Sequence, residues 1–419
     1  MSASVTAEGL AAALAPVAQC KAIGLAVSGG ADSLALMVLV RRWARDIANP
    51  PAIIVYSVDH GLRPEARLEV EMVVREAERL GLPARALRWT GAKPGTGVQE
   101  AARLARYGLI GQAMAEDGAE ILLTAHHIND QAETVLMRLA HGSGLDGLSA
   151  MQPFSLVEGV PIFRPLLGVD PKVLRATVEA EGMTPAEDPS NNDPHYERVR
   201  WRKVLPRLAE LGLDADALYR FSQRAAQAEE ALAVTANISF AEIVRLDGFG
   251  SAEVDADQFA AVPKAIADRI LARVLRIVGG QQKPRALGVV ERLREALVAG
   301  DVSKTRTVLG CVVRNAGGII SVAREPGRTS LPKMRLDPQT EFVWDQRFLI
   351  ANLSSAAGLA VVPAEYWQRR HLEELFGFRI TAPMEAIRTS PMVVDGQDKV
   401  LSLGTHAFDE RIRVTFLTE

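Results

Sequence analysis

Ala26-Val27-Ser28-Gly29-Gly30-Ala31-Asp32-Ser33 is the stretch around which this chain is organised. The apolar run before it, over residues 22–27, predicts a short buried strand. The two glycines permit a tight turn and a close approach of the backbone to a ligand. Asp32 and Ser33 then begin a strongly apolar helix. A strand, a glycine turn and a helix N-terminus together gather free N–H donors, and such a cluster binds phosphate.

The loop differs from the two commonest phosphate-binding loops. It is shorter than a Walker A loop and has no Gly-Lys-Ser/Thr, and it does not match a GxGxxG dinucleotide turn. The hydroxyls of Ser28 and Ser33 add possible donors. An ordinary strand–turn–helix with a Ser/Asp cap has the same residue types, so the loop alone leaves that interpretation open.

The composition indicates a soluble globular protein of two or three domains. The chain has 419 residues, of which 48% are hydrophobic and 24% charged. Its two cysteines, Cys20 and Cys311, form no Cys-x-x-Cys pair, which excludes a cysteine metal knuckle or a dithiol centre. No membrane-length apolar run and no basic leader are present, so we expect a cytoplasmic protein without membrane contact. The net charge of −3 argues against non-specific nucleic-acid binding.

Strands and helices are predicted to alternate through the first half of the chain. Strands are expected at residues 22–27, 52–58, 84–89 and 119–124, and helices at 6–17, 65–80, 98–115 and 129–140. This order predicts an α/β fold, a doubly wound parallel sheet with helices on both faces. Ligands bind such sheets beyond the carboxyl ends of the strands. The glycine loop, Asp59-His60 and His126-His127 all follow strands and should converge there.

The second half of the chain differs from the first in its predicted secondary structure. A further strand or extended segment is expected at residues 160–167, then a helix at 172–181, a turn-rich loop at 187–194 and a basic helix at 196–211. Residues 215–246 and 256–298 are helical in period. After residue 305 short strands follow, with a hairpin predicted between 308–313 and 319–323. We therefore expect domains at residues 1–212, 213–304 and 305–419.

Two acidic residues lie at the start of the predicted helix 129–140. Asp130 and Glu133 are three residues apart, so they share one face. The helix dipole favours acids at this end and could account for both by itself. A position at the edge of the crevice favours a functional role instead. The neighbouring His126-His127 lacks the His-x-x-x-His spacing of a zinc site, so polar contacts to a nucleotide or substrate are the preferred interpretation.

Basic residues form two further candidate sites. Arg103 and Arg106 share a helix face, and Arg106, beside Tyr107, is the better candidate for an acidic ligand. The patch Arg198-Val-Arg-Trp-Arg-Lys203 is dense in charge and carries one aromatic residue. It suits contacts with phosphate groups and equally suits a solvated helix face.

Five segments, in the same order as in the family, resemble the tRNA(Ile)-lysidine synthetases, bacterial ligases of the PP-loop ATP pyrophosphatase superfamily. The resemblance covers residues 22–208 and rests on Ser28–Ser33, Asp59-His-Gly-Leu-Arg-Pro64, Gln99-Glu-Ala-Ala-Arg-Leu-Ala-Arg-Tyr107, Ala125-His-His-Ile-Asn-Asp-Gln-Ala-Glu-Thr134 with Gly142-Ser-Gly-Leu-Asp-Gly147, and Glu187-Asp-Pro-Ser-Asn191. It implies a PP-loop sheet of the adenine nucleotide alpha hydrolase-like type. A helical domain and a small α+β C-terminal domain would follow, and both would contact tRNA.

The resemblance also implies the reaction. Such an enzyme uses ATP and Mg²⁺ to join free L-lysine to C2 of the wobble cytidine in the CAU anticodon of tRNA(Ile). The product is lysidine, formed through an adenylated tRNA with release of pyrophosphate and AMP. The chain does not fix an oligomeric state, and a homodimer is one option.

Roles for individual residues follow from the same resemblance. ATP would be bound by Ser28, Gly29, Gly30, Ala31, Asp32, Ser33, Ser57, His60 and His126, with Mg²⁺ on Asp32. Asp130 and Glu133 would hold the amines of lysine, and Arg106 its carboxylate. Asp32, Asp130 and Arg106 would be the catalytic residues. tRNA would be bound by Arg198, Arg200, Arg202 and Lys203.

Two departures from the family pattern and two alternative functions remain. Asn129 stands where the family often has an acid, so a metal role at that position is not carried over, and Val199 replaces a usual Asn in the basic patch.

Another PP-loop enzyme is one alternative, either a tRNA thiolase, which normally needs cysteines near the site, or an amidating synthetase, which needs a glutaminase. A non-catalytic nucleotide sensor is the other, and it would need neither the acidic pair nor the basic helix.

Overall fold

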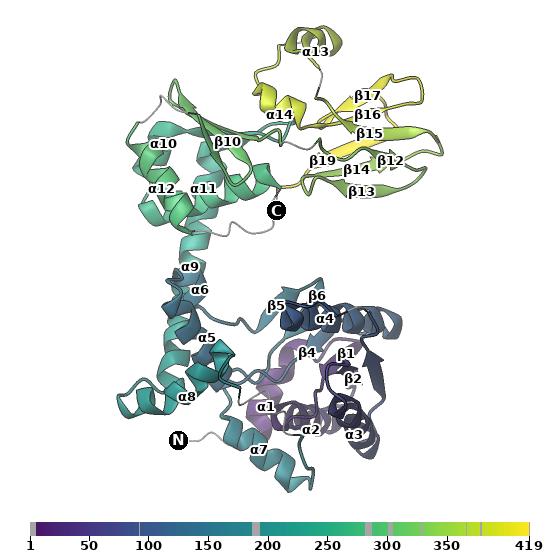
Figure 1. The fold of residues 1–419 in the computed structure, drawn as a ribbon, viewed down its shortest axis with the longest axis vertical. Coiled ribbons are helices and arrows are strands. Elements are labelled where there is room, and N and C mark those ends of the chain that lie inside the picture. The colour runs from purple at the N-terminus through teal and green to yellow at the C-terminus, as the bar shows by residue number, and fades with distance from the viewer. Residues whose placement is uncertain are drawn as a thin grey trace. The chain divides into compact units, whose positions relative to one another are not determined.

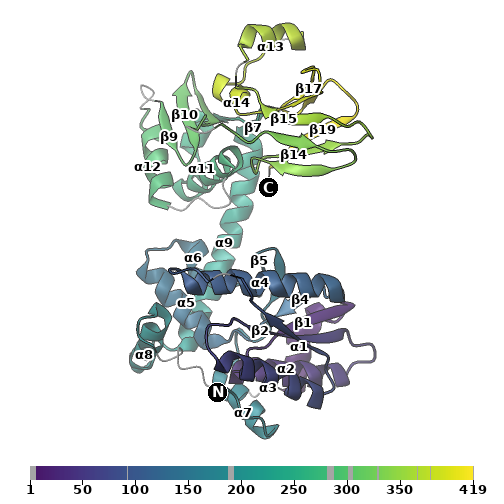
Figure 2. The ribbon, with the colours of Figure 1, turned by 45° about the vertical axis from the view of Figure 1, so that its right-hand side comes forward.

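The computed structural model describes residues 6–91, 93–186, 193–280, 287–300, 305–327, 330–365, 367–377 and 379–418. The chain divides into two compact units, Met1–Glu229 and Glu230–Glu419, which are described separately (Figures 1 and 2). Of the turn-rich loop predicted at residues 187–194, positions 187–192 lie outside the described residues.

The first unit is built on a six-stranded sheet with the order β3-β2-β1-β4-β6-β5. Its strands are β1 (Ala22–Ala26), β2 (Ala52–Asp59), β3 (Ala84–Arg88), β4 (Ile121–Leu123), β5 (Phe154–Val157) and β6 (Val160–Phe163). All neighbours pair in parallel except β5, which pairs antiparallel with β6. The predicted α/β fold is confirmed, and β5 is an edge strand that the sequence pattern did not reveal.

Helices cover both faces of this sheet (Figures 1 and 2). On one face a core joins β1 to α1 (Ala7–Leu14), α2 (Ala31–Arg45), α3 (Glu65–Arg79) and α7 (Pro171–Ala180). On the other face α4 (Val98–Asp117) packs on β1, β2 and β6 through a second apolar cluster. The predicted helices therefore form where their apolar faces can be buried against the strands.

Gly24 shows how closely the layers of the sheet fit. A Cβ atom built on it would lie 2.7 Å from Cε2 of Tyr56 and 3.1 Å from Cδ1 of Leu122. The Tyr56 ring is buried, and its hydroxyl donates to Oδ2 of Asp117 at 2.9 Å. Because the ring is fixed at both ends, only glycine fits beneath it at the centre of β1.

A separate helical layer lies beside the carboxyl edge of the sheet. It contains α5 (Ile128–Ala140), α6 (Leu145–Leu148), α8 (Glu197–Glu210) and the first part of α9 (Ala215–Ile243). Residues of α5, α8 and α9 share one apolar cluster, which includes Val135, Leu205 and Leu218. This packing fixes the basic helix α8 against the acidic start of α5.

The second unit combines helices with three antiparallel sheets. Helices α10 (Ala256–Ala261), α11 (Lys264–Gly279) and α12 (Leu287–Val298) pack on the sheet β7-β8-β11-β10-β9. Its strands are β7 (Val244–Leu246), β8 (Ala252–Asp255), β9 (Arg306–Val308), β10 (Cys311–Ala316) and β11 (Ile319–Arg324). The predicted hairpin is confirmed, with Cys311 opposite Arg324. Residues 244–246 were expected to be helical and form β7 instead, because pairing with β8 buries Val244.

The remaining strands form two smaller sheets. One has the order β12-β15-β16-β17-β18, with β12 (Met334–Leu336), β15 (Leu359–Pro363), β16 (Pro391–Val394), β17 (Val400–Leu403) and β18 (His406–Ala407). The other has the order β13-β14-β19, with β13 (Glu341–Trp344), β14 (Phe348–Asn352) and β19 (Ile412–Phe416). Helices α13 (Arg369–Phe376) and α14 (Met384–Arg388) complete the unit. The domain boundaries expected at residues 212 and 304 stay predictions, and strands from both sides of residue 304 share one sheet.

A buried charge cluster ties the parts of the second unit together. Arg347 is fully buried; its Nε donates to Oδ2 of Asp345 at 2.8 Å and its Nη2 to the carbonyl of Thr389. Arg324 of β11 reaches the same carboxylate at 3.1 Å and also donates to the carbonyl of Gly279. One carboxylate therefore compensates two guanidinium groups drawn from two sheets.

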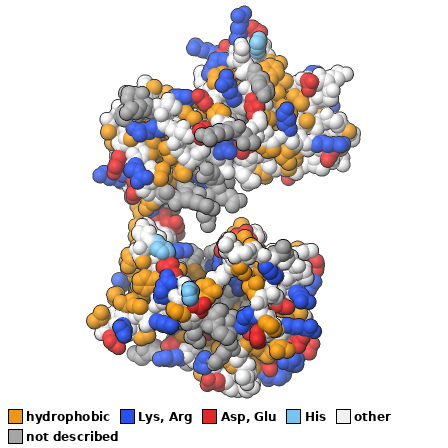
Figure 3. Space-filling view, in the orientation of Figure 1, with side chains coloured by type: hydrophobic (Ala, Val, Ile, Leu, Met, Phe, Trp, Pro, Cys, Tyr) orange, Lys and Arg blue, Asp and Glu red, His pale blue; other side chains and the backbone are white. Residues whose placement is uncertain are grey.

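Two surface properties complete the description. On the face shown in Figure 3, Lys and Arg side chains are interspersed with Asp and Glu over both units. Within the described parts of the chain, we find no helix with both the length and the apolar character needed to cross a bilayer.

Candidate active site

The glycine loop, residues 28–30, connects the carboxyl end of β1 to the start of α2. Gly29 has a φ of +93°, which glycine adopts at little cost, and its carbonyl accepts from the N–H of Ala186 at 2.9 Å. The Ser33 hydroxyl donates to the carbonyl of Gly30 at 2.9 Å and accepts from the N–H of Ser28 at 3.2 Å. Ser33 thus closes the turn from within, while Ser28 is exposed.

The start of α2 has the properties of an anion site. Its N-cap is Gly30, and no described side chain caps it. The N–H groups of its first turn therefore have no side-chain acceptor among the described residues and can bind a phosphate. Asp32, whose side chain is 42% exposed, stands in this first turn.

His127 lies between two acidic residues, Asp32 of α2 and Asp130 of α5. Its Nε2 lies 3.5 Å from Oδ2 of Asp32 and 3.5 Å from Oδ2 of Asp130. His127 is also the N-cap of α5, where its Nδ1 accepts from the N–H of Asn129 at 3.2 Å. In return its own N–H donates to Asp130 at 3.0 Å, which completes a capping box. Burial disfavours the charged imidazole, but the hydrogen bond to Asp32 and the nearby carboxylates outweigh it and raise the pKa of His127.

His126 has the opposite electrostatics. Its Nδ1 lies 2.9 Å from the hydroxyl of Thr124, at the end of β4. Burial lowers the pKa of His126 to about 4. The charge of Asp130 opposes this shift, and the charges of Arg164, Arg198 and Arg106 add to it. The ring is therefore neutral near pH 7 and can serve as a hydrogen-bond partner.

Two polar atoms beside the glycine loop have no partner. Oγ of Ser57, on β2, and Nδ1 of His60, just beyond it, are buried and make no hydrogen bond to any described residue. Buried polar groups are normally satisfied, so such atoms mark a place for a polar ligand. Burial, followed by the charge of Arg106, lowers the pKa of His60 and keeps it neutral. Both residues fit a nucleotide bound across the ends of β1 and β2.

Glu133 is fully buried beneath the basic helix. Its Oε2 accepts from Nε of Arg198 at 2.7 Å, and its Oε1 from Nε of Arg202 at 2.8 Å. Arg198 also lies 3.4 Å from Oδ1 of Asp130. Burial opposes ionisation of Asp130, but the charges of His127 and Arg198 outweigh it and lower its pKa. The two arginines thus compensate both acids of α5.

The other basic residues of α8 have a different environment. Arg200 donates to the carbonyls of Pro194 and His195, both at 3.0 Å, and it is exposed like Lys203. Arg198 and Arg202 remain 39% and 46% exposed at their side chains. One face of the helix therefore binds α5, and the other faces solvent.

A metal ion has limited protein support here. Among the residues that the structure describes, no group of three His, Cys, Asp or Glu side chains has a metal-binding arrangement. Asp32 is partly exposed in the first turn of α2. One carboxylate together with phosphate oxygens and waters is the kind of ligand set that Mg²⁺ accepts, so the residues fit a substrate-bound ion.

Several residues that the sequence predicted for the site lie close together in the structure. The glycine loop, Ser57, His60, His126 and Asp130 lie at one edge of the sheet, and the charge of Arg106 acts on both His60 and His126. The roles assigned to these residues stay predictions. The sequence did not reveal the bridge made by His127 or the ion pairs of Glu133. It also missed Arg164, whose only signal was a lone arginine directly after an apolar strand.

Comparison with known proteins gives first the class and then the family. Residues 3–208 match the family model of the PP-loop domain. A tRNA(Ile)-lysidine synthase of Rhodopseudomonas palustris is 44% identical over 317 residues, which cover 73% of this chain and 91% of the relative. The Ruegeria pomeroyi enzyme of the same name is 36% identical over 389 residues, which cover 90% and 87%. This chain belongs to the tRNA(Ile)-lysidine synthase family.

Proposed function

We propose that this protein joins free L-lysine to the wobble cytidine of a tRNA(Ile) with a CAU anticodon. The C2 oxygen of the cytidine attacks the α-phosphorus of ATP, and the bond to pyrophosphate breaks. An amine of lysine then attacks C2, gives up a proton, and the C2–O bond breaks to release AMP. Both steps take place where tRNA is made and used, so we place the enzyme in the cytoplasm.

The observation that carries this proposal is the meeting of two acids at His127. Asp32 comes from the anion-binding end of α2, and Asp130 from the start of α5, each 3.5 Å from Nε2 of that histidine. A ligase that first adenylates and then admits an amine needs a phosphate site and an ammonium site in contact. This arrangement supplies both at one edge of the sheet.

The ATP site would be made by the glycine loop and the end of β2. The first-turn N–H groups of α2 and the Ser28 hydroxyl would hold the pyrophosphate part, where charge develops in the first step. The unpartnered atoms of Ser57 and His60 would bind the nucleoside. Mg²⁺, held through Asp32, would neutralise phosphate charge.

The lysine site would lie between α4 and α5. Asp130 has a lowered pKa, which makes it a weak proton acceptor, so we assign it to holding an ammonium group. Arg106, whose charge reaches both His60 and His126, would bind the carboxylate. Glu133 would be the second acid of this site, and an ammonium there would share its carboxylate with Arg198 and Arg202.

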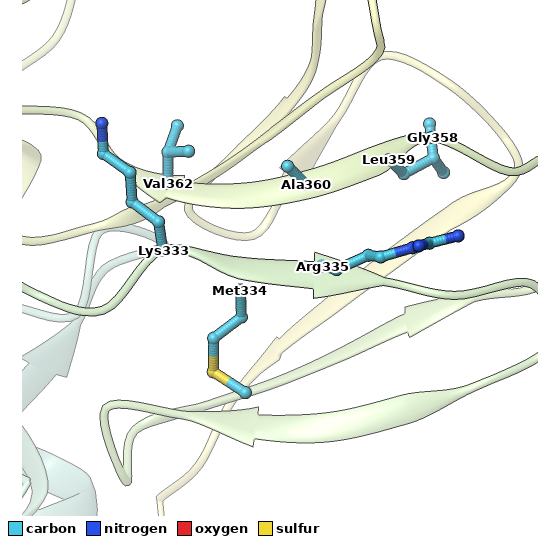
Figure 4. Close-up of a pocket in the computed structure, with 7 residues that line it drawn as sticks. All are labelled: Lys333, Met334, Arg335, Gly358, Leu359, Ala360 and Val362. Atoms are coloured by element: carbon cyan, nitrogen blue, oxygen red, sulfur yellow. The ribbon is translucent and has the colours of Figure 1, made fainter.

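tRNA would contact the solvent face of α8 and the second unit. Arg200 and Lys203 are exposed, and Arg198 and Arg202 are half-exposed. In the second unit, Lys333, just before the edge strand β12, and Arg335 within it line a shallow depression beside β15 (Figure 4). Two exposed cations two residues apart suit contacts with a phosphate backbone.

The depression can be tested by charge reversal. The double variant Lys333→Glu, Arg335→Glu should weaken tRNA binding and reduce its salt slope by about two units, because each lost phosphate contact contributes about one. Equal affinity and an equal slope for the variant and the wild type would remove this surface from the proposal. ATP binding by the first unit serves as the control.

The alternative PP-loop chemistries have less support. Cys20 precedes β1 and thus lies at the amino edge of the parallel sheet, opposite the glycine loop. Cys311 is a buried residue of the second unit. A thiolase would need a cysteine at the carboxyl edge of the sheet, whereas Cys20, the cysteine of the first unit, lies at its amino edge.

The proposed function is tested by AMP release from wild-type protein. AMP should appear only with ATP, a CAU transcript and lysine together, and pyrophosphate should form with the transcript before lysine is added. A transcript with a different anticodon is the matched control. AMP release that does not depend on lysine would contradict the proposal and favour another PP-loop enzyme.

A further inference from the structure

Arg164 is a buried cation with no role in the site described so far. It directly follows β6 and is 7% exposed. Its Nη1 donates to the carbonyl of Gln152 at 2.8 Å and to Oγ of Ser155 at 2.9 Å. Its Nε is buried and has no hydrogen-bond partner among the described residues. No described carboxylate forms an ion pair with it.

The surroundings of Arg164 do not compensate its charge. Burial lowers the pKa of Arg164, and of the two nearby groups the phenol of Tyr107 raises this pKa and the cation of Arg103 lowers it further. A buried guanidinium without a counter-charge is costly, and proteins normally pair such groups. Among the residues that the structure describes, no acid fills this place, so Arg164 is open to an anionic ligand.

Arg164 faces the same space as Arg106. Phe163 pairs with Leu123, and the N–H of Thr124 donates to the carbonyl of Phe163 at 3.0 Å, which puts Arg164 level with Thr124. Ile162 belongs to the core under α4, and a residue two positions on in a strand points the same way. The charges of Arg164 and Arg106 both act on His126.

We propose that Arg164 and Arg106 together bind the carboxylate of the free amino-acid substrate, with the Nε and fork of Arg164 as the inner donors. This assignment rests on the proposed function and deepens it. A small carboxylate can reach a guanidinium that is 7% exposed, whereas the phosphates of a folded RNA meet exposed cations such as those of α8. Arg164 is then a specificity residue, because it distinguishes lysine from a diamine without a carboxylate.

The test compares lysine with cadaverine, which has both amines and no carboxylate. In Arg164→Gln the KM for lysine should rise about 10- to 150-fold, the effect of one lost charge-assisted hydrogen bond, while that for cadaverine stays unchanged. The KM of Arg164→Lys for lysine should lie between those of the wild type and Arg164→Gln, because a lysine side chain keeps the charge but cannot form two parallel hydrogen bonds to a carboxylate. Arg175→Gln, on the exposed side of α7, is the control. Pyrophosphate release on tRNA without lysine should be unaffected.

Other outcomes would overturn the assignment. If the KM values for lysine and cadaverine change equally, or if neither changes, the role of Arg164 is only to stabilise the position of β5. A raised KM for tRNA with an unchanged KM for lysine would assign it to an RNA phosphate. Calorimetric titration of lysine and cadaverine into the full-length protein measures the affinity for each ligand without turnover. It therefore tests the role of Arg164 even if the wild-type protein releases no AMP. Loss of AMP release with lysine binding retained would contradict the proposed function alone.

Discussion

Replacing Glu133 by Gln tests the centre of the proposed site. The substitution keeps the shape of the side chain and removes its charge. In the native protein the carboxylate accepts from Arg198 at 2.7 Å and from Arg202 at 2.8 and 3.4 Å. A glutamine has one acceptor oxygen, and its amide group would point donors at a guanidinium that can only donate. At least one charge-assisted hydrogen bond is therefore lost.

The size of the effect follows from the burial of the three side chains. One such bond contributes about 1.5–3 kcal/mol. Removing one partner of a fully buried pair costs about 3–5 kcal/mol, but both arginines are more than a third exposed and can turn to water, so the lower range applies. For a unit of this size, 1 kcal/mol corresponds to about 2–4 °C in Tm. We expect Glu133→Gln to lower the Tm of the first unit by about 3–12 °C.

Two assays separate the structural and the chemical role of Glu133. Thermal unfolding reports the ion pairs, with Glu210→Gln at the exposed end of α8 as the control. Lysine titration of pre-adenylated tRNA reports the pocket, where the KM for lysine should rise about 10- to 150-fold with adenylation nearly intact. An unchanged Tm would refute the ion-pair reasoning. Blocked adenylation with normal lysine saturation would move Glu133 to the ATP–Mg²⁺ site.

Three further predictions concern other groups. Asp32→Ala should fold and lose AMP and pyrophosphate formation, measured by chromatography of labelled nucleotides, because Asp32 stands in the first turn of α2, where we propose that the phosphates bind. His126→Gln should flatten the loss of unfolding free energy between pH 6.5 and about 4, measured by urea titration. The wild type loses stability as the pH falls through this window, because the unfolded chain takes up the proton that folded His126, with its pKa of about 4, refuses. Asp345→Asn should destabilise the second unit by about 3–5 kcal/mol in calorimetry, because it leaves the fully buried Arg347 and the partly buried Arg324 without this acid, while ATP binding persists.

Each of these has a result that would count against it. Unchanged AMP release from Asp32→Ala would end its assignment to the ATP site. Superimposable pH curves for the wild type and His126→Gln would mean that this histidine titrates normally in the folded protein. Asp337→Asn breaks an exposed pair with Arg335 and is the control for the buried cluster, since exposed pairs contribute about 0–1 kcal/mol. An Asp345→Asn variant as stable as this control would contradict the reasoning.

The sequence predicted those parts of the fold that depend on local pattern. The parallel sheet followed from apolar runs alternating with amphipathic helices, and the hairpin of β10 and β11 from a Gly-Gly turn between two such runs. The strands β5, β7 and β8 have only three or four residues, too few for a period to show, and they exist because a partner strand pairs with them. Local preference does not contain that information.

The candidate site likewise has features that the sequence predicts and features that depend on tertiary packing. The positions of Asp32, His60 and Asp130 at one edge follow from the topology of parallel strands. The partners of Glu133 do not, because Arg198 and Arg202 lie 65 and 69 residues further along the chain. Their spacing of four residues showed that they share a helix face and left open what that face meets. Only the packing of α5 on α8 determines it.

The tight contact at Gly24 has a consequence for inheritance. Any other residue there would push against a tyrosine ring that Asp117 holds in place, so the strand leading into the glycine loop would shift. A library of random alleles should therefore yield null or temperature-sensitive strains at codon 24, although this residue lies four positions before the loop begins. A geneticist who mapped such alleles would count Gly24 among the active-site residues, when its whole contribution is the absence of a side chain.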